Sequence, residues 1–248
     1  HAKTFAPELW GNWSERFPPT KEDPHRTARI YLQSRGLDTS KFGFEQGTWK
    51  EQGKTITTVA FQFSWTDRRW HRLIDPPDGV GKTRWDAGDS DAYRGQAWTT
   101  GEIDPKKELW ITEGIFEVLS LQQDADLQAA ATFSSSHIPT AFYQTLDPTQ
   151  PIVIALNSDP AGRDWTFKNI WKLKDLGFTN VKAAQPPPGK DWNDLLVAGA
   201  FKAEGREQSI EDAFWSGSLL VAETFGQYRK VYEERHSSPE KGGHYEGL

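Results

Sequence analysis

The sequence contains neither cysteine nor methionine among its 248 residues. The lack of cysteine excludes disulfide bonds and cysteine-based zinc sites within the chain, and it fits the cytoplasmic protein that we expect. No apolar run approaches the roughly 18 residues needed to cross a bilayer, so no membrane partner is expected. Because the sequence begins with His and lacks Met, we expect it to be an excised piece of a longer protein.

The chain also lacks an excess of positive charge, since its net charge is −6. Proteins that coat nucleic acid by bulk charge are basic, so that class is excluded. A nucleic-acid role would instead need a local basic patch, or a metal ion that bridges acidic side chains to phosphate. Aromatic residues are abundant, with 12 Trp and 14 Phe. Their large apolar area predicts a folded core.

The N-terminal part of the chain predicts an irregular arm followed by a small α+β subdomain. Residues 1–25 are rich in Pro and Trp and have no clear period. A helix is expected after Asp23-Pro24, because Asp can cap a helix and Pro suits its first turn. Two β-like runs follow, Thr55–Trp65 and Arg69–Ile74. We assign this subdomain to residues 26–106.

The pattern changes at residue 107, where apolar β-like runs begin to alternate with helical patterns. This alternation continues to residue 200 and predicts βαβ units and a parallel sheet. The run Pro151–Leu156 is apolar on both faces, which is typical of a central buried strand. We therefore expect an α/β fold over residues 107–200. Residues 201–248 predict a helical stretch at Ile210–Tyr232 and a polar tail.

Three carboxylates follow three of the predicted strands, at the edge where α/β sheets bind ligands. Glu113 follows Leu109–Thr112, Asp159 follows the central apolar run, and Asp191 follows Val181–Gln185. Adjacent parallel strands lie about 4.8 Å apart, so such carboxylates can converge on one cation. Mg²⁺ prefers a few carboxylates together with water and phosphate oxygens. The alternative, that Asp159 and Asp191 only cap the following helices, stays open.

The segments that carry these acids resemble the motifs of the Toprim family. LWITEGIFEVLSL is similar to the first motif, a strand that ends in Glu-Gly. IVIALNSDPAG resembles the second motif, and GKDWNDLL resembles the closing motif of primase-type members. The resemblance implies a Toprim-like parallel sheet flanked by helices. Upstream, ARIYLQSRGLDTSKFGFEQG resembles a helix of the bacterial replicative primase core, which implies a smaller α+β subdomain before the sheet.

The resemblance also implies roles for individual residues. It makes Glu113 the candidate general base or metal ligand, and Asp159 and Asp191 the candidate ligands of Mg²⁺ or Mn²⁺. Glu117 and Asn157 are further candidate ligands, but both depart from the family pattern, which has Asp at each position. A neutral amide oxygen holds a cation less strongly than a carboxylate does. Asn157 therefore leaves open whether the site is catalytic.

The function implied by the resemblance is that of a DNA primase-type nucleotidyltransferase. Such an enzyme makes primers from nucleoside triphosphates on single-stranded DNA. The divergence of the motifs suggests the replication of a plasmid, phage or integrated mobile element, with a replicative helicase as a candidate partner. Two alternatives remain: a catalytically degenerate Toprim module that binds nucleic acid or a replication partner, and a Toprim nuclease.

A locally basic stretch interleaved with aromatic residues precedes the first Toprim strand. Stacking of bases on aromatic rings, with Arg contacts to phosphate, is how proteins hold single strands. The stretch is therefore a candidate template or nucleotide groove, although a solvated strand face with core tryptophans would have the same composition. The aromatic residues are Trp65, Trp70, Trp85 and Tyr93. The candidate nucleic-acid-binding cations are Arg68, Arg69, Arg72, Lys82, Arg84 and Arg94.

Overall fold

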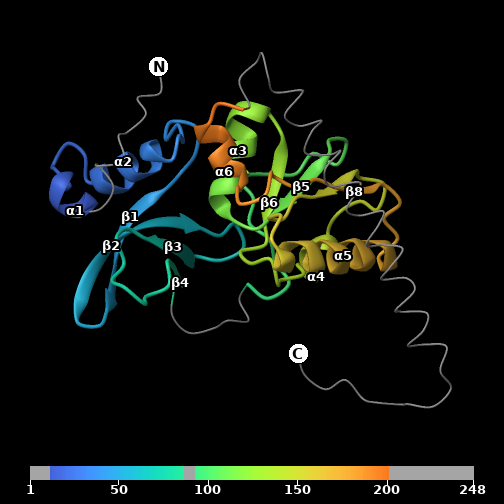
Figure 1. Ribbon diagram of the computed structural model, residues 1–248, viewed down its shortest axis with the longest axis horizontal. Coiled ribbons are helices and arrows are strands. Elements are labelled where there is room, and N and C mark those ends of the chain that lie inside the picture. Colours follow the sequence, from blue (N-terminus) through green and yellow to red (C-terminus); the bar gives the residue numbers. More distant parts are fainter. Residues whose placement is uncertain (1–11, 87–92, 201–248) are drawn as a thin grey trace.

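The computed structural model describes residues 12–86 and 93–200 (Figure 1). These residues form two four-stranded sheets, one antiparallel and one parallel. No helix within them has the length and apolar character required to cross a membrane. The predicted helix at Ile210–Tyr232 and the polar tail lie outside the described residues.

The N-terminal subdomain is an antiparallel meander with two helices before it. Its elements are α1 (Trp13–Arg16), α2 (Arg26–Ser34), β1 (Glu45–Glu51), β2 (Lys54–Gln62), β3 (Arg69–Leu73) and β4 (Thr83–Trp85). The strands lie in chain order. Sequence patterns predicted α2, β2 and β3 but did not identify β1. That strand, EQGTWKE, has no fully buried side chain, so it lacks the apolar alternation that marks a half-buried strand.

The C-terminal subdomain is a parallel sheet flanked by helices, which confirms the predicted α/β fold. Its strand order is β6-β5-β7-β8, and all three strand pairs are parallel. The elements are β5 (Leu109–Thr112), α3 (Ile115–Ala125), β6 (Gln128–Ala131), α4 (Thr140–Tyr143), β7 (Ile152–Ile154), α5 (Pro160–Asp175), β8 (Val181–Ala183) and α6 (Trp192–Val197).

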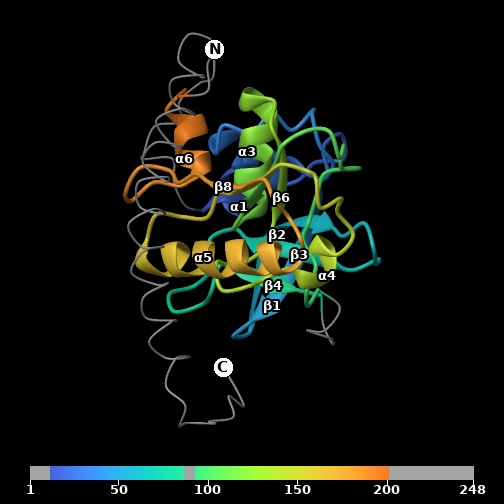
Figure 2. The same ribbon diagram turned by 90° about the vertical axis from the view of Figure 1, so that its right-hand side faces the viewer.

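Helices cover both faces of the parallel sheet, as the two views show (Figures 1 and 2). Successive side chains of a strand point to opposite faces. Trp110 and Val153 accordingly pack in one buried cluster with residues of α3 and α6. Their neighbours Ile111 and Ile154 pack in a second cluster with residues of α4 and α5. The central strands are therefore apolar on both faces, which explains the unbroken apolar run in the sequence.

The two sheets are joined through Trp98 and through the first turn of α3. The backbone of Trp98 exchanges two hydrogen bonds with Ala131 at the end of β6, at 2.9 and 2.8 Å. Its indole Nε1 donates to the carbonyl of Gln62 in β2 at 3.0 Å. The Phe116 ring of α3 packs against Trp70 of the antiparallel sheet. The antiparallel sheet therefore lies beside the N-terminus of α3, near the carboxyl edge of the parallel sheet.

Candidate active site at the carboxyl edge of the parallel sheet

The predicted acidic residues follow three adjacent strands of the parallel sheet. Glu113 directly follows β5, Asp159 comes five residues after the end of β7, and Asp191 lies beyond β8. The strands β5, β7 and β8 are hydrogen-bonded neighbours in that order. All three acids therefore lie at the carboxyl edge, where open α/β sheets bind their ligands.

Asp159 and Asp191 each cap the helix that follows them. Asp159 Oδ1 accepts a hydrogen bond of 2.6 Å from the backbone of Gly162, at the start of α5. Asp191 Oδ1 accepts one of 2.7 Å from the backbone of Asp194, and the two residues form a capping box. Within residues 12–86 and 93–200, the Oδ2 atom of each accepts no hydrogen bond. The capping role therefore leaves one oxygen of each carboxylate available to a ligand.

Gly162 fixes the position of Asp159 relative to the end of β7. A Cβ atom at residue 162 would lie 2.1 Å from the carbonyl oxygen of Asn157, which is far inside van der Waals contact. Only glycine permits this close approach of two backbone segments. The start of α5 is thereby pressed against the strand end that carries Asn157, and Asp159 is held with it.

Glu113 shares one electrostatic environment with the other acids. Burial is the largest effect on its carboxyl group and raises its pKa above the ordinary value. The charges of Asp159 and Asp191 raise the pKa further, whereas the backbone N–H of Ser135 and the amide of Asn157 lower it. Asn157 Nδ2 donates to Glu113 Oε2 at 3.0 Å. These groups therefore form one site, in which a bound cation would relieve repulsion between carboxylates.

Glu117 faces the backbone of the turn that precedes its helix. Its side chain is buried, and Oε2 accepts a 3.2 Å hydrogen bond from the backbone N–H of Glu113. Burial and then the charges of Asp191 and Glu113 raise the pKa of Glu117 well above its usual value. The backbone N–H groups of Glu113 and Gly114 oppose this increase. Glu117 thus stabilises the Glu-Gly turn, a structural role that the sequence did not reveal, and its role as a metal ligand stays a prediction.

The site offers oxygen donors of the kind that a hard cation prefers. Besides the Oδ2 atoms of Asp159 and Asp191, Asn157 Oδ1 is buried and has no hydrogen-bond partner in the structure. A buried acceptor without a donor is costly, and a cation would satisfy it. In the part of the chain that the structure describes, no three acidic or histidine side chains form a ready-made metal cage. The donor set therefore fits an ion that keeps water or phosphate oxygens among its ligands, as Mg²⁺ does.

The loop after β6 also contributes to the site, although this was not predicted from the sequence. The backbone N–H of Ser135 faces Glu113, and the Thr132 backbone donates to the Thr112 carbonyl at 2.9 Å. Phe133 adopts a left-handed backbone conformation, with φ of 69°. Almost any residue type can supply a backbone N–H donor, so the sequence does not reveal which residue does so. The only signal was the polar run of serines after a strand.

At least three of the six predicted cations contact other side chains of the protein. Arg69 and Arg84 form ion pairs of 3.0 and 2.9 Å with glutamates of β1. The Arg72 guanidinium lies over the ring of Phe116, 5.7 Å from its centroid. The remaining three are Lys82 and Arg94, which are exposed, and Arg68, which is half-buried. The structure does not test the nucleic-acid contacts predicted for these six residues.

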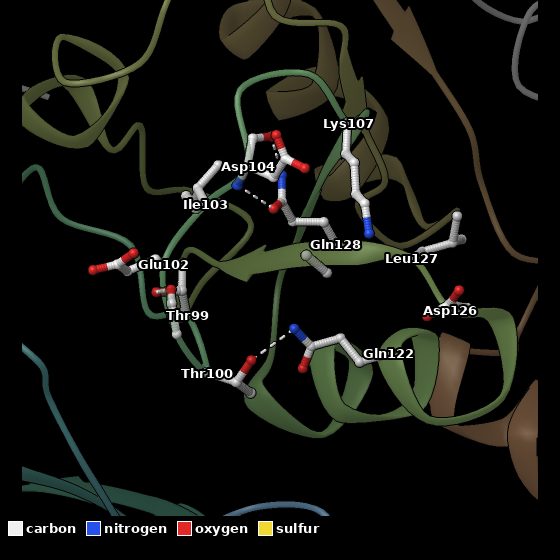
Figure 3. A pocket seen from close by; sticks show the side chains of 12 residues that line it. Thr99, Thr100, Glu102, Ile103, Asp104, Lys107, Gln122, Asp126, Leu127 and Gln128 are labelled. Carbon is white, nitrogen blue, oxygen red and sulfur yellow. Dashed lines mark hydrogen bonds between the residues drawn. The ribbon is translucent and has the colours of Figure 1, made fainter.

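A polar pocket of about 340 Å³ lies at the opposite edge of the parallel sheet (Figure 3). Lys107, which precedes β5, and Gln128, at the start of β6, line it. A hydrogen bond of 2.7 Å from Gln122 to Thr100 closes one side. The pocket contains none of the predicted site residues. Because it lies at the amino ends of the strands, it is not where an α/β sheet of this kind places its chemistry.

Comparison with known proteins places the C-terminal subdomain in a family. Residues 108–200 match the model of the Toprim domain. A stretch of 96 residues is 34% identical to the DNA primase of Mycoplasma pneumoniae, and it covers 37% of this chain and 15% of that protein. The chain thus corresponds to a small part of the length of this relative.

Solved structures extend the likeness to both subdomains. The DnaG catalytic core has a TM-score of 0.58 and 20% identity, with 84% of this chain and 82% of that chain covered. The E. coli primase catalytic core has a TM-score of 0.56 and 17% identity, with coverage of 84% and 80%. At such identities the likeness is one of fold. Residues 108–200 are therefore a Toprim domain, and the chain has the fold of a DNA primase catalytic core.

Proposed function

We propose that this chain is the catalytic core of a DNA primase, a nucleotidyltransferase that joins nucleoside triphosphates into a primer on single-stranded DNA. The observation that carries the proposal is the position of Glu113, Asp159 and Asp191 after three neighbouring strands of a Toprim sheet, where the charges of the two aspartates act on Glu113. Carboxylates gathered in this way are suited to holding a divalent ion against phosphate.

Each group of the site would have a separate role. Bound Mg²⁺ or Mn²⁺ would supply positive charge against the phosphates. The free oxygens of Asp159 and Asp191, with Asn157 Oδ1, would hold the ion. Glu113, whose pKa is raised by burial, would accept the proton of the attacking hydroxyl group. The N-terminus of α5 would add a favourable dipole for a phosphate group.

The biological setting belongs to the same proposal. We propose that the protein replicates a plasmid, phage or integrated mobile element, because Asn157 in place of the expected acid marks a diverged motif. A replicative helicase would be the partner that brings single-stranded DNA to the chain. Neither point is needed for the chemistry, which can be tested with the isolated protein.

A primer-synthesis assay tests the proposed activity. The protein would be incubated with single-stranded DNA and labelled ribonucleoside or deoxyribonucleoside triphosphates in Mg²⁺ or Mn²⁺. We expect short labelled products that disappear when EDTA removes the ion and return when excess ion is added. Nicking of a supercoiled plasmid without synthesis would instead identify a nuclease. Nucleic-acid binding without either activity would identify a degenerate module, the alternative that Asn157 favours.

Restoring an acid at position 157 should change the affinity of the site for metal. In Asn157→Asp, we expect Mn²⁺ to bind several-fold more tightly, because a carboxylate adds charge to the ligand set. The same change removes the amide donor that bonds to Glu113, so the ion-free protein should lose stability. Isothermal titration with Mn²⁺ and chemical denaturation in EDTA measure the two effects. An unchanged or weaker Mn²⁺ affinity would show that residue 157 does not face the ion.

A further inference from the structure

The side chain of Asn193, two residues after Asp191, is bonded to two other helices. It is fully buried. Its amide Nδ2 donates to the carbonyl of Arg35, at the end of α2, and to the hydroxyl of Ser120, within α3, at 2.9 Å in each case. One amide group therefore joins the start of α6 to both of these helices.

Both acceptors require a donor at position 193. A backbone carbonyl can only accept a hydrogen bond. The hydroxyl proton of Ser120 is already donated to the carbonyl of Phe116 at 2.7 Å, so Ser120 Oγ accepts from Asn193. The two N–H groups of an asparagine amide satisfy both acceptors, whereas an ionised carboxylate has no donor. Among the described residues, Oδ1 of Asn193 is buried without a partner, so the amide makes these two bonds despite one unsatisfied acceptor.

The helices α3 and α6 carry two of the three site carboxylates at their first turns. α3 begins after Glu113-Gly114, and Asp191 is the N-cap of α6. α6 has only six residues, too few for a helix to be stable by itself, so contacts with other elements determine where its N-cap lies. The bond from Asn193 to Ser120 fixes α6 against α3, and it thereby constrains the separation of Asp191 from Glu113.

The turn after α2 is itself held in place, so the Arg35 carbonyl is a fixed acceptor. Gln123 of α3 donates from Nε2 to the Gly36 carbonyl at 2.9 Å and accepts at Oε1 from the Asp38 backbone at 2.6 Å. A Cβ atom at Gly36 would lie 3.4 Å from the Val197 side chain of α6, so the turn also packs against that helix. The start of α6 is therefore anchored to the N-terminal subdomain as well as to α3.

We propose that Asn193 is a positioning residue, which sets the place of Asp191 relative to Glu113 by anchoring the start of α6 to α3 and to the end of α2. This inference rests on the proposed metal-dependent function and names a buried residue, outside the carboxylates, on which metal binding depends. Asn193 would touch neither the ion nor the substrate. Its effect on metal binding should therefore pass through Asp191.

Isothermal titration with Mn²⁺ would compare Asn193→Ala with the matched control Asn169→Ala. Asn169 is also fully buried, accepts from the Tyr143 hydroxyl at 2.7 Å and donates to the Trp165 carbonyl at 2.9 Å. It lies ten residues beyond Asp159 along α5, about 15 Å away at the helical rise per residue. The control thus loses a comparable pair of buried bonds away from the carboxyl edge.

Asn193→Ala should weaken Mn²⁺ binding by about tenfold, the lower end of the range for residues that orient metal ligands. Asn169→Ala should bind Mn²⁺ like the wild type, although both variants should lose stability in urea, because each leaves buried polar groups without partners. In an Asp191→Asn background, which keeps the helix cap, Asn193→Ala should weaken binding no further. Circular dichroism at the titration temperature would establish that each variant is folded.

Equal weakening by Asn193→Ala and Asn169→Ala would overturn the inference, because loss of stability alone would explain both. Unchanged affinity of Asn193→Ala, a further loss in the Asp191→Asn background, or no Mn²⁺ binding by the wild type would also overturn it. If Asn193→Ala does not fold, Ser120→Ala, which removes one of the two acceptors, replaces it in the same comparison. Primer synthesis is not measured, so a protein that shows the expected pattern but makes no primer would contradict the proposed function and not this inference.

Discussion

Replacing Glu113 by Gln should lower primer synthesis by about 10²- to 10⁴-fold, the range for loss of a general acid–base or a charged group at a reacting centre. Glutamine keeps the size of the side chain and can still accept the hydrogen bond from Asn157. It cannot take up a proton at neutral pH, and it removes one negative charge from the site. Because burial and neighbouring charges raise the pKa of Glu113, the variant should be at least as stable as the wild type without metal.

The control is Glu108→Gln, the same change at the opposite end of the same strand. Glu108 precedes β5 and forms a 3.0 Å ion pair with Lys182, far from the carboxyl edge. Its replacement should leave the rate of primer synthesis within about twofold, since exposed ion pairs contribute little. Initial rates under saturating template and nucleotide measure both variants. If Glu113→Gln were as active as Glu108→Gln, the carboxyl edge would not be the catalytic site.

Replacing Trp192 by Ala should destabilise the protein by about 3–5 kcal/mol, as large-to-small changes of buried aromatic residues do. Trp192 is fully buried, packs edge-on against Trp110 at 5.4 Å, and donates from Nε1 to the Ala155 carbonyl at 2.7 Å. The alanine variant would leave a cavity and an unsatisfied buried carbonyl. Because Trp192 directly follows Asp191, its loss should also displace that carboxylate.

Trp171→Ala is the matched control for this prediction. Trp171 lies on α5 and is 38% exposed, so its loss should change the free energy of unfolding by about 0.5 kcal/mol or less. Urea denaturation followed by circular dichroism measures both variants, since secondary structure does not depend on the deleted fluorophore. Equal effects of the two changes would contradict the anchoring role of Trp192.

The sequence predicted the parallel sheet well because its signal is local. The strands β5 and β7 are apolar on both faces and are followed by turn residues, and Asp159-Pro160 marks the start of α5 as a cap and a first-turn proline. The antiparallel subdomain was harder to predict. Polar β1 is paired along its length with β2, and such pairing between segments is not visible in the residue types of one strand.

The candidate site was predictable in position but not in geometry. Each acid follows a predicted parallel strand, so the grouping of Glu113, Asp159 and Asp191 at one edge was predicted without knowledge of the strand order β6-β5-β7-β8. The orientation of Glu117 toward the backbone did not, because it depends on how far one extra methylene reaches in a packed turn. The stacked rings of Trp65, Phe63, Trp85 and Tyr93 come from the β2–β3 connection, β4 and one loop. Only the folded chain brings such residues together.

Trp98 links the two sheets and so limits how they could move relative to each other while DNA passes. It is tied by its backbone to β6 and by its indole to β2, so neither sheet can slide without breaking bonds to the other. A template strand bound to the antiparallel sheet would therefore lie at a constant distance from the carboxylates of the parallel sheet. DNA would then advance over two sheets that keep the same separation, rather than between two parts that open and close at each nucleotide.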